Sequence, residues 1–218
     1  MYKAIIFDMD GTILDTLEDL AYSLNYALKK NNLPTRTIKE VRSMIGNGIY
    51  VLCEKGVPED TSKTTINKVF NDLNEHYAIH CCDHTGPYDG IKDLLKDLHH
   101  QDLLTAVVSN KADYAVQSLC KDYFDGDFNI AVGLREDFNK KPAPDTVNEV
   151  LRLLDVSKEE AVYIGDSEVD IETCLNVPVE CIVVDWGFRD REFLVDHGAK
   201  VIVSSVDELK EYLTRKQA

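Results

Sequence analysis

Apolar and polar positions along the chain form two kinds of pattern. Short apolar runs predict strands at 3–9, 103–110, 128–134, 161–167, 180–187 and 200–205. From about residue 86 onward, stretches with helical spacing separate these runs, and the alternation of strand and helix predicts a parallel sheet with crossover helices. Residues 15 to 83 show helical periodicity alone, which indicates a separate all-helical region.

One arrangement accommodates both patterns. We predict an α/β fold with a Rossmann-like open parallel sheet, whose first strand is separated from the others by an inserted helical region. The predicted domains are an α/β core formed by residues 1–14 and 84–218, and an all-helical cap formed by residues 15–83. Within the cap, Thr37 and Glu40 have the spacing of a capping box, which predicts a short helix ending near Gly46.

Composition and charge narrow the function. The chain has 218 residues, 44% of them hydrophobic and 29% charged, as in ordinary globular proteins. Its net charge of −15 argues against nucleic acid as a partner, because such binding needs a basic surface. We find neither an apolar run of about 18 residues nor the pattern of a secretory signal, so we expect a cytoplasmic protein without a membrane partner.

The cysteines do not form a recognisable metal motif. There are six, at positions 53, 81, 82, 120, 174 and 181, and no two have CxxC spacing. We therefore expect reduced thiols. The segment "HYAIHCCDH" (76–84) is rich in His and Cys, but its spacing matches no zinc pattern, and we interpret it as a solvated hinge with a partly buried cysteine.

Polar side chains follow the predicted strands at the points where these strands end. Asp8 and Asp10 end the first strand, and carboxylates two residues apart on an extended segment lie on one face, where their charges repel. Ser109 ends the second strand, and Asp166 follows the fourth. Ligands of open α/β sheets bind outside the carboxyl ends of the strands, so we expect these residues to converge on one site.

The chain resembles the haloacid dehalogenase superfamily, in its phosphatase branch with a helical cap after the first strand. The motifs that carry this resemblance occur in the family's order: "DMDGT" (8–12), "SN" (109–110), "KPAPD" (141–145) and "GDSEVD" (165–170). The segment "DWGFRDREFLVDHGA" (185–199) also resembles the phosphoglycolate-phosphatase-like subgroup. The resemblance covers nearly the whole chain.

This resemblance implies catalytic roles for the carboxylates. Asp8 would be the nucleophile that forms an aspartyl-phosphate, and Asp10 would protonate the leaving oxygen and then deprotonate the attacking water. Mg²⁺ would be held by Asp8, the backbone carbonyl of Asp10 and Asp166, with Asp170 supporting these ligands. A carboxylate such as Asp166 could alternatively be the N-cap of the next helix.

The resemblance also implies residues that bind the phosphate and the substrate. Lys141, rather than its neighbour Lys140, would neutralise charge on the phosphate and the nucleophile. We assign the remaining contacts to Thr12, Ser109, Asn110 and, in the cap loop "IGNGI" (45–49), Asn47. Two alternatives stay open: Ser109 and Asn110 could cap the following helix, and the Asn47 loop could be a plain helix end.

We therefore expect a Mg²⁺-dependent phosphomonoester hydrolase that acts on a small phosphorylated metabolite, with phosphoglycolate as the first candidate. The alternatives are a sugar-phosphate mutase, a pyrophosphatase or a nucleotidase on the same scaffold, and a catalytically weak binding protein. The presence of Asp10 favours phosphate chemistry, because the dehalogenases of the superfamily lack an equivalent residue. We expect a monomer or a homodimer.

Overall fold

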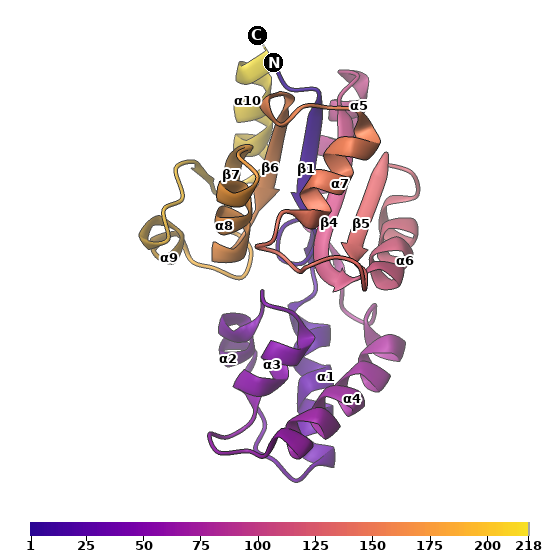
Figure 1. Ribbon diagram of the computed structural model, residues 1–218, viewed down its shortest axis with the longest axis vertical. Coiled ribbons are helices and arrows are strands. Elements are labelled where there is room, and N and C mark those ends of the chain that lie inside the picture. The colour runs from indigo at the N-terminus through magenta and orange to yellow at the C-terminus, as the bar shows by residue number, and fades with distance from the viewer. Residues whose placement is uncertain (218) are drawn as a thin grey trace. The chain divides into compact units, whose positions relative to one another are not determined.

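The chain divides into two compact units. The computed structural model describes residues 1–217 (Figure 1). One unit comprises Met1–Leu14 together with the chain from Pro87 on, and the other comprises Asp15–Gly86. The chain passes between the units twice, through β2 (Leu14–Asp15) and β3 (Gly86–Pro87), which pair as a two-stranded sheet.

The first unit is built on a six-stranded sheet in the order β5-β4-β1-β6-β7-β8, in which neighbouring strands are parallel. Its strands are β1 (Ala4–Asp8), β4 (Leu104–Ala112), β5 (Ile130–Leu134), β6 (Ala161–Gly165), β7 (Glu180–Val184) and β8 (Ile202–Val203). Its helices are α5 (Ile91–His100), α6 (Asp113–Phe124), α7 (Asp145–Leu154), α8 (Glu168–Asn176), α9 (Arg191–Asp196) and α10 (Val206–Gln217), with a 3₁₀ turn at Lys158–Glu160.

Helices cover both faces of this sheet. Successive residues of β1 alternate between the two sides, because side chains along a strand point to opposite faces. Ile5 and Phe7 pack in one cluster with residues of α5, α6 and α10, whereas Ala4 and Ile6 pack in another with residues of α7 and α8. All five residues of β1 are buried, which explains why its sequence is a continuous apolar run rather than an alternating one.

Side chains of α6 bond to the backbone of the edge strand β5. Gln117 Nε2 donates to the carbonyl of Ala131 at 2.7 Å, and the amide of Gly133 donates to Asp113 Oδ1 at 2.8 Å. An edge strand otherwise offers unpaired backbone groups to other chains. These two bonds occupy one carbonyl and one amide of β5 and so reduce what this edge strand offers for pairing with another chain.

Between β2 and β3, the elements of the second unit are helices. These are α1 (Leu17–Lys30), α2 (Ile38–Met44), α3 (Ile49–Gly56) and α4 (Lys63–His80). The apolar stripe of α1 is buried, including Leu20, Leu24 and Leu28, and α1 packs mainly on α4. The predicted capping box is present, because the amide of Glu40 donates to Thr37 Oγ1 at 3.2 Å and the amide of Thr37 donates to Glu40 Oε2 at 2.7 Å.

The structure confirms the predicted fold class, an open parallel α/β sheet with an inserted helical region. Each predicted apolar run contains a strand, although β4 extends two residues beyond the predicted end, to Ala112. Two short helices, α3 and α9, were not predicted, because eight and six residues give too little periodicity to detect. Across residues 1–217, no helix combines the length and the apolar character needed to cross a bilayer.

Candidate active site

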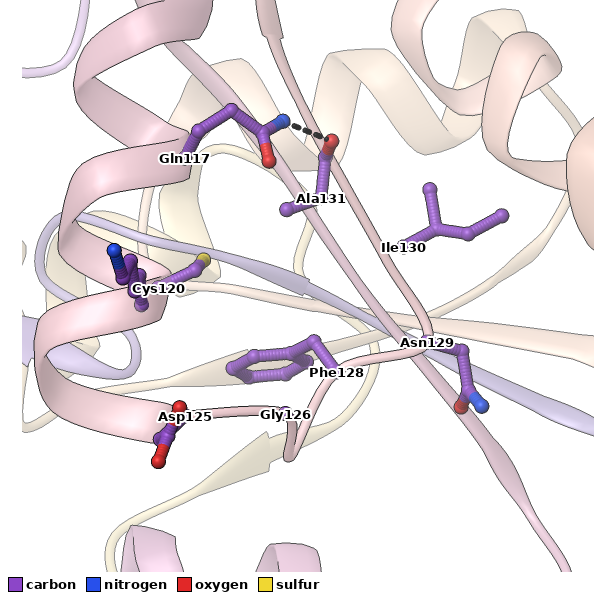
Figure 2. Close-up of a pocket in the computed structure, with 9 residues that line it drawn as sticks. Gln117, Cys120, Asp125, Gly126, Phe128, Asn129, Ile130 and Ala131 are labelled. Atoms are coloured by element: carbon purple, nitrogen blue, oxygen red, sulfur yellow. Dashed lines mark hydrogen bonds between the residues drawn. The ribbon is translucent and has the colours of Figure 1, made fainter.

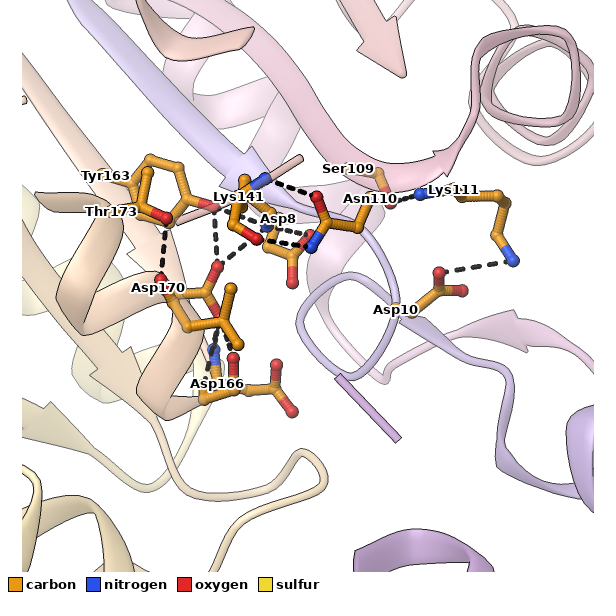
Figure 3. A network of polar contacts seen from close by, with 12 residues as sticks. Asp8, Asp10, Ser109, Asn110, Lys111, Lys141, Tyr163, Asp166, Asp170 and Thr173 are labelled. Atoms are coloured by element: carbon orange, nitrogen blue, oxygen red, sulfur yellow. Dashed lines mark hydrogen bonds and ion pairs between the residues drawn. The ribbon is translucent and has the colours of Figure 1, made fainter. Parts of the chain in front are cut away.

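The candidate site lies at the carboxyl ends of three adjacent strands. Asp8 is the last residue of β1, Ser109 lies in β4 beside it, and Asp166 follows the last residue of β6. The register aligns Asp8 with Val108 of β4, so Ser109 comes one residue further along. Figure 3 shows these residues together with Lys141, which reaches the site from the loop before α7.

Lys141 joins two of the carboxylates. Its side chain is 3% exposed, and its ammonium lies 2.8 Å from Asp8 Oδ1 and 2.9 Å from Asp170 Oδ1. It also donates to the Tyr163 hydroxyl at 2.9 Å, and that hydroxyl donates to Asp170 Oδ1 at 2.7 Å. Although burial alone would lower the pKa of Lys141, the charges of Asp170 and Asp8 raise it above its ordinary value, so the side chain is a cation at neutral pH.

Asp170 uses both of its oxygens within the protein. Oδ1 accepts from Lys141 and Tyr163, while Oδ2 accepts from Ser167 Oγ at 2.6 Å and from the amides of Ser167 and Asp166 at 3.1 and 3.2 Å. Burial opposes ionisation, but Lys141 and these donors hold the pKa of Asp170 below its ordinary value. The N-cap of α8 is therefore Ser167, in a capping box with Asp170, and the alternative in which Asp166 caps the helix is wrong.

Asp166 is held against two glycines. Its Oδ2 accepts from the amide of Phe188 at 2.6 Å. A Cβ on Gly11 would lie 2.3 Å from Asp166 Oδ2, and one on Gly187 would lie 2.4 Å from the same oxygen. Gly11 also has φ of +87°, a conformation that favours glycine. The glycine of the "DMDGT" segment thus allows the backbone to approach this carboxylate closely.

Three carboxylates at the site could hold a metal ion. Oxygens of Asp8, Asp166 and Asp170 lie within 4.8 Å of one another. Burial, followed by the charge of Asp170, raises the pKa of Asp8 to about 7 despite its contact with Lys141, and the same two causes raise the pKa of Asp166. A cation between these groups would lower both values. Because the Asp170 oxygens are already bonded, Asp8 and Asp166 are the side chains that fit direct ligation, and their oxygens suit a hard divalent cation.

Asp10 is paired with a lysine that our sequence analysis did not select. Lys111 Nζ lies 3.3 Å from Asp10 Oδ2, and the lysine side chain is 5% exposed. Figure 3 shows the Asp10 carboxylate turned toward Lys111. The other oxygen, Oδ1, is buried and has no hydrogen-bond partner within residues 1–217. Lys111 directly follows "SN", so a prediction that included the next residue of the strand as a site candidate would have found it.

Asn110 and Ser109 make contacts other than those expected of helix caps. The amide of Lys141 donates to Asn110 Oδ1 at 2.7 Å, and Asn110 Nδ2 donates to the Lys141 carbonyl at 3.1 Å. Both ends of the Asn110 amide therefore bond to the Lys141 backbone, and its predicted contact with phosphate stays a prediction. Ser109 Oγ accepts from the amide of Lys111 at 3.1 Å, and the N-cap of α6 is Ala112.

The two remaining predicted contacts, Thr12 and Asn47, lie in different units of the chain. Thr12 is fully buried, and its carbonyl accepts from Trp186 Nε1 at 3.1 Å. Its hydroxyl has no hydrogen-bond partner in the described part of the chain. Asn47 lies between α2 and α3 in the helical unit. Tyr163, which bonds to Lys141, was missed because it lies inside an apolar run.

A separate cavity lies away from these residues, beside the edge strand. It has a volume of about 250 Å³ and lies between α6 and the chain leading into β5 (Figure 2). Its lining includes Gln117, Cys120, Phe128 and Ala131, and it contains none of the predicted site residues. Gln117 and Ala131, two of the lining residues, are joined by a hydrogen bond (Figure 2). This cavity is therefore separate from the predicted site.

Comparisons with known proteins agree with this geometry. Residues 5–184 match the family model described as haloacid dehalogenase-like hydrolase. A phosphoglycolate phosphatase of Aquifex aeolicus is 32% identical over 85% of this chain and 86% of its own. A crystal structure from Lactobacillus delbrueckii subsp. bulgaricus, of a protein provisionally named a phosphoglycolate phosphatase, is 39% identical, with a TM-score of 0.92 and coverage of 97% and 98%.

A further relative was solved with a bound ligand. The structure of CbbY from Rhodobacter sphaeroides, in complex with phosphate, is 25% identical, with a TM-score of 0.77 and 96% coverage of both chains. The predicted resemblance to the superfamily, and to its phosphoglycolate-phosphatase-like members, is confirmed. The chain is therefore an enzyme of phosphatase type that belongs to the haloacid dehalogenase-like hydrolase family.

Proposed function

We propose that the chain is a Mg²⁺-dependent phosphomonoester hydrolase that works through an aspartyl-phosphate on Asp8. The observation that carries this proposal is the placement of Asp8, a buried carboxylate at a strand end, 2.8 Å from the Lys141 ammonium and beside Asp166. A carboxylate needs nearby positive charge before it can attack a phosphoryl group that is itself anionic. Lys141 supplies part of this charge, and bound Mg²⁺ would supply the rest.

Each half of the reaction uses Asp8 and Asp10 differently. In the first half, an Asp8 oxygen forms a bond to phosphorus while the ester bond breaks, and Asp10 gives its proton to the departing oxygen. In the second half, Asp10 takes a proton from water as the water oxygen attacks phosphorus, which releases inorganic phosphate and restores Asp8. Asp8, Asp166 and the Asp10 carbonyl would hold Mg²⁺.

We assign Lys111 to positioning Asp10. Its ammonium binds Asp10 Oδ2, so the buried Oδ1 is the oxygen left to exchange a proton with the leaving group. A carboxylate without such a partner would be able to rotate about its terminal bond, which has broad torsional preferences. Lys111 thereby fixes which oxygen faces the reaction.

We assign Asn110, Tyr163 and Asp170 to positioning Lys141. Asn110 holds the lysine backbone, while Tyr163 and Asp170 hold its ammonium. Among the predicted phosphate contacts are Thr12 and Ser109. Both side chains are buried, and the Thr12 hydroxyl lacks a partner within residues 1–217, so it has a free donor for a ligand.

The substrate class follows from the relatives. Phosphoglycolate is our first candidate because the Aquifex and Lactobacillus proteins carry that name, and the phosphate bound to CbbY supports an oxyanion ligand on this scaffold. We propose that the helical unit acts as the cap that selects the leaving group, with Asn47 as a substrate contact. An Asn47→Ala variant should raise KM with little change in kcat, and an unchanged KM would remove Asn47 from the substrate site.

The test is phosphate release from a panel of phosphorylated metabolites, with Mg²⁺ and with a chelator. The panel should contain phosphoglycolate, hexose phosphates, nucleotides and pyrophosphate. We expect Mg²⁺-dependent release from phosphoglycolate, and no release by an Asp8→Asn variant. Full activity in chelator would contradict the metal requirement, full activity of Asp8→Asn would contradict the nucleophile, and isomerisation of a hexose phosphate without release would indicate a mutase.

A further inference from the structure

Two adjacent cysteines bring their sulfurs together in the helical unit. Cys81 and Cys82 follow the end of α4, and their Sγ atoms lie 3.6 Å apart. Cys82 is exposed and Cys81 is half-buried. Neither residue has a role in the proposed reaction.

The separation fits chelation better than a disulfide. A disulfide needs its sulfurs about 2.05 Å apart, so these two would have to approach by about 1.5 Å within adjacent residues. Two sulfurs that each lie about 2.3 Å from one shared tetrahedral centre are about 3.8 Å apart. The observed 3.6 Å is close to that value. Trivalent arsenic forms bonds to sulfur of similar length, and its pyramidal geometry, with a narrower angle between these bonds, brings the two sulfurs slightly closer together.

A zinc site does not fit the same residues. Structural zinc is held by four protein ligands, usually Cys and His. Within residues 1–217, the group of His, Cys, Asp or Glu side chains placed closely enough for three ligands is Asp8, Asp166 and Asp170, none of which lies near this pair in sequence. His80, which precedes the cysteines, has its Nδ1 2.8 Å from Asp83 Oδ2. The cysteines therefore offer two sulfur ligands without a complete metal shell.

We propose that Cys81 and Cys82 form a chelating site for trivalent organic arsenicals. In the binding step, an arsenical R–As=O forms two As–S bonds, both S–H bonds break, and the two protons leave with the oxygen as water. Arsenic stays trivalent, so the step needs no oxidant. A monothiol adduct would exchange readily, whereas two sulfurs on one arsenic gain from their high effective concentration.

Three of the other cysteines are poor competitors for this ligand. Burial raises the pKa of the Cys53 and Cys120 thiols to about 12. A hydrogen bond with Cys181, together with burial, also raises the pKa of Cys174. The thiolate is the reactive form, so these three are less reactive near neutral pH. The arsenical should therefore select Cys81 and Cys82, because Cys82 is exposed and the two sulfurs are adjacent.

Bound arsenic would fix a turn that is already anchored on one side. The next residues, His84 and Thr85, donate their amides to the buried carboxylate of Asp19 at 3.0 and 2.8 Å. A ring through residues 81 and 82 would therefore extend this ordered segment back toward α4. The adduct should slow proteolysis and amide exchange in this segment.

The test uses the reduced full-length chain with phenylarsine oxide, followed by intact-protein mass spectrometry. We expect one adduct, with the mass of a phenylarsenic group less two protons, that 2,3-dimercaptopropanol removes and excess glutathione does not. Cys81→Ser and Cys82→Ser should each lose it, whereas the matched control Cys181→Ser should keep it. Circular dichroism checks that each variant is folded.

Several outcomes would overturn the site. An adduct that persists in Cys82→Ser, disappears in Cys181→Ser, or is removed by glutathione alone would place the arsenic elsewhere or on one sulfur. Failure of the folded, reduced chain without substitutions to form an adduct that dimercaptopropanol removes would also overturn the site. None of these outcomes bears on the phosphatase proposal, because they do not involve phosphate release.

Discussion

The Lys141 ammonium lies between two carboxylates, 2.8 Å from Asp8 and 2.9 Å from Asp170. The two contacts serve different purposes. Asp170 is saturated with donors and stays ionised, so it holds the lysine in place, whereas Asp8 keeps its second oxygen for chemistry. The lysine thus links a fixed anion to a reacting one.

Replacing Lys141 with Met should affect both stability and turnover. Two buried carboxylates would lose their cation, and removing one partner of a buried ion pair costs about 3–5 kcal/mol. Loss of charge stabilisation at phosphate should lower kcat by about 10²–10³-fold. Urea unfolding and phosphate release measure the two effects. The matched control is Lys140→Met, at the exposed neighbour, which should change stability by less than about 0.5 kcal/mol. Equal effects at the two positions would contradict the assignment.

Replacing Lys111 with Met should impair reactions that need a proton on the leaving group. Alkyl phosphates need it, whereas p-nitrophenyl phosphate has a good leaving group. We expect alkyl ester hydrolysis to fall by at least about tenfold, while the first-turnover burst of p-nitrophenolate is nearly unchanged. The Lys111→Arg variant should recover part of the loss, because it keeps the charge beside Asp10.

The leaving-group comparison separates positioning from general damage to the site. Asp10→Asn should show the same dependence on the leaving group as Lys111→Met, with a larger effect. If Lys111→Met slows both substrates equally, the lysine supports the fold of the site and does not act through Asp10.

The strand-end residues show how much of the site the sequence predicts. In a parallel sheet the chain direction is shared, so polar residues that end separate apolar runs must meet at one edge. This reasoning places Asp8, Ser109 and Asp166 together without any structure. Asp8 ends β1, Asp166 follows the end of β6, and Ser109 lies in the adjacent strand β4, one residue beyond the register of Asp8. The strands themselves are predicted well because they are buried on both faces.

Residues that act through other residues could not be predicted in this way. Tyr163 lies within an apolar run, and only the three-dimensional structure shows that its hydroxyl accepts a hydrogen bond from Lys141. Asn110 was predicted to contact phosphate because "SN" resembles the second motif of the superfamily, and that resemblance does not predict the bonds of its amide to the Lys141 backbone. Periodicity indicates which face a residue occupies and does not indicate its partner.

The affinity for Mg²⁺ should fall at acidic pH. Burial and Asp170 raise the pKa of Asp8 from 3.8 to about 7, so below pH 7 the carboxyl carries a proton that the metal must displace. Calorimetry should show about tenfold weaker binding at pH 6 than at pH 8, with proton release at the lower pH. Binding that is independent of pH in this range would contradict direct ligation by Asp8.

The same raised pKa fixes the sign of a stability effect in metal-free protein. Between about pH 4 and pH 7 the folded carboxyl of Asp8 keeps a proton that the unfolded chain has lost, so its contribution to the free energy of unfolding decreases as pH rises. Saturating Mg²⁺ should remove this decrease. Chelated and Mg²⁺-loaded protein compared by thermal unfolding at several pH values would measure it.

Replacing Gly11 with Ala should abolish metal binding. The new Cβ would lie 2.3 Å from Asp166 Oδ2, so that carboxylate would have to move. Gly198→Ala is a matched control, because Gly198 has φ of +88° against +87° for Gly11 but has no atom within 4 Å of the added Cβ. Both variants should lose about 1 kcal/mol from backbone strain, and only Gly11→Ala should lose Mg²⁺ affinity. Equal affinities by calorimetry would show that Asp166 is not held against Gly11.

Replacing Asp19 with Asn should destabilise the helical unit. The Asp19 carboxylate is buried and accepts from the amides of His84 and Thr85, from the Thr85 hydroxyl at 2.8 Å and from His84 Nδ1 at 2.9 Å. An amide NH₂ cannot accept these bonds, so we expect a loss of about 2–3 kcal/mol in urea unfolding. Glu75→Gln, at an exposed residue of α4, is the control and should change stability by less than about 0.5 kcal/mol.

The pH dependence of this variant gives a second readout with a defined sign. Although burial opposes ionisation, the bonds from His84 and Thr85 hold the pKa of Asp19 below 3.8, so its contribution to stability is present above that pH. This contribution is lost as pH falls through the pKa of Asp19 in the folded state. Protonation removes the negative charge that accepts the hydrogen bonds from His84 and Thr85. Wild type should therefore lose more stability than Asp19→Asn between pH 5 and the acid limit of folding. Parallel acid unfolding curves for the two proteins would show that the carboxylate is not ionised in the folded state, and the assigned hydrogen bonds would then be wrong.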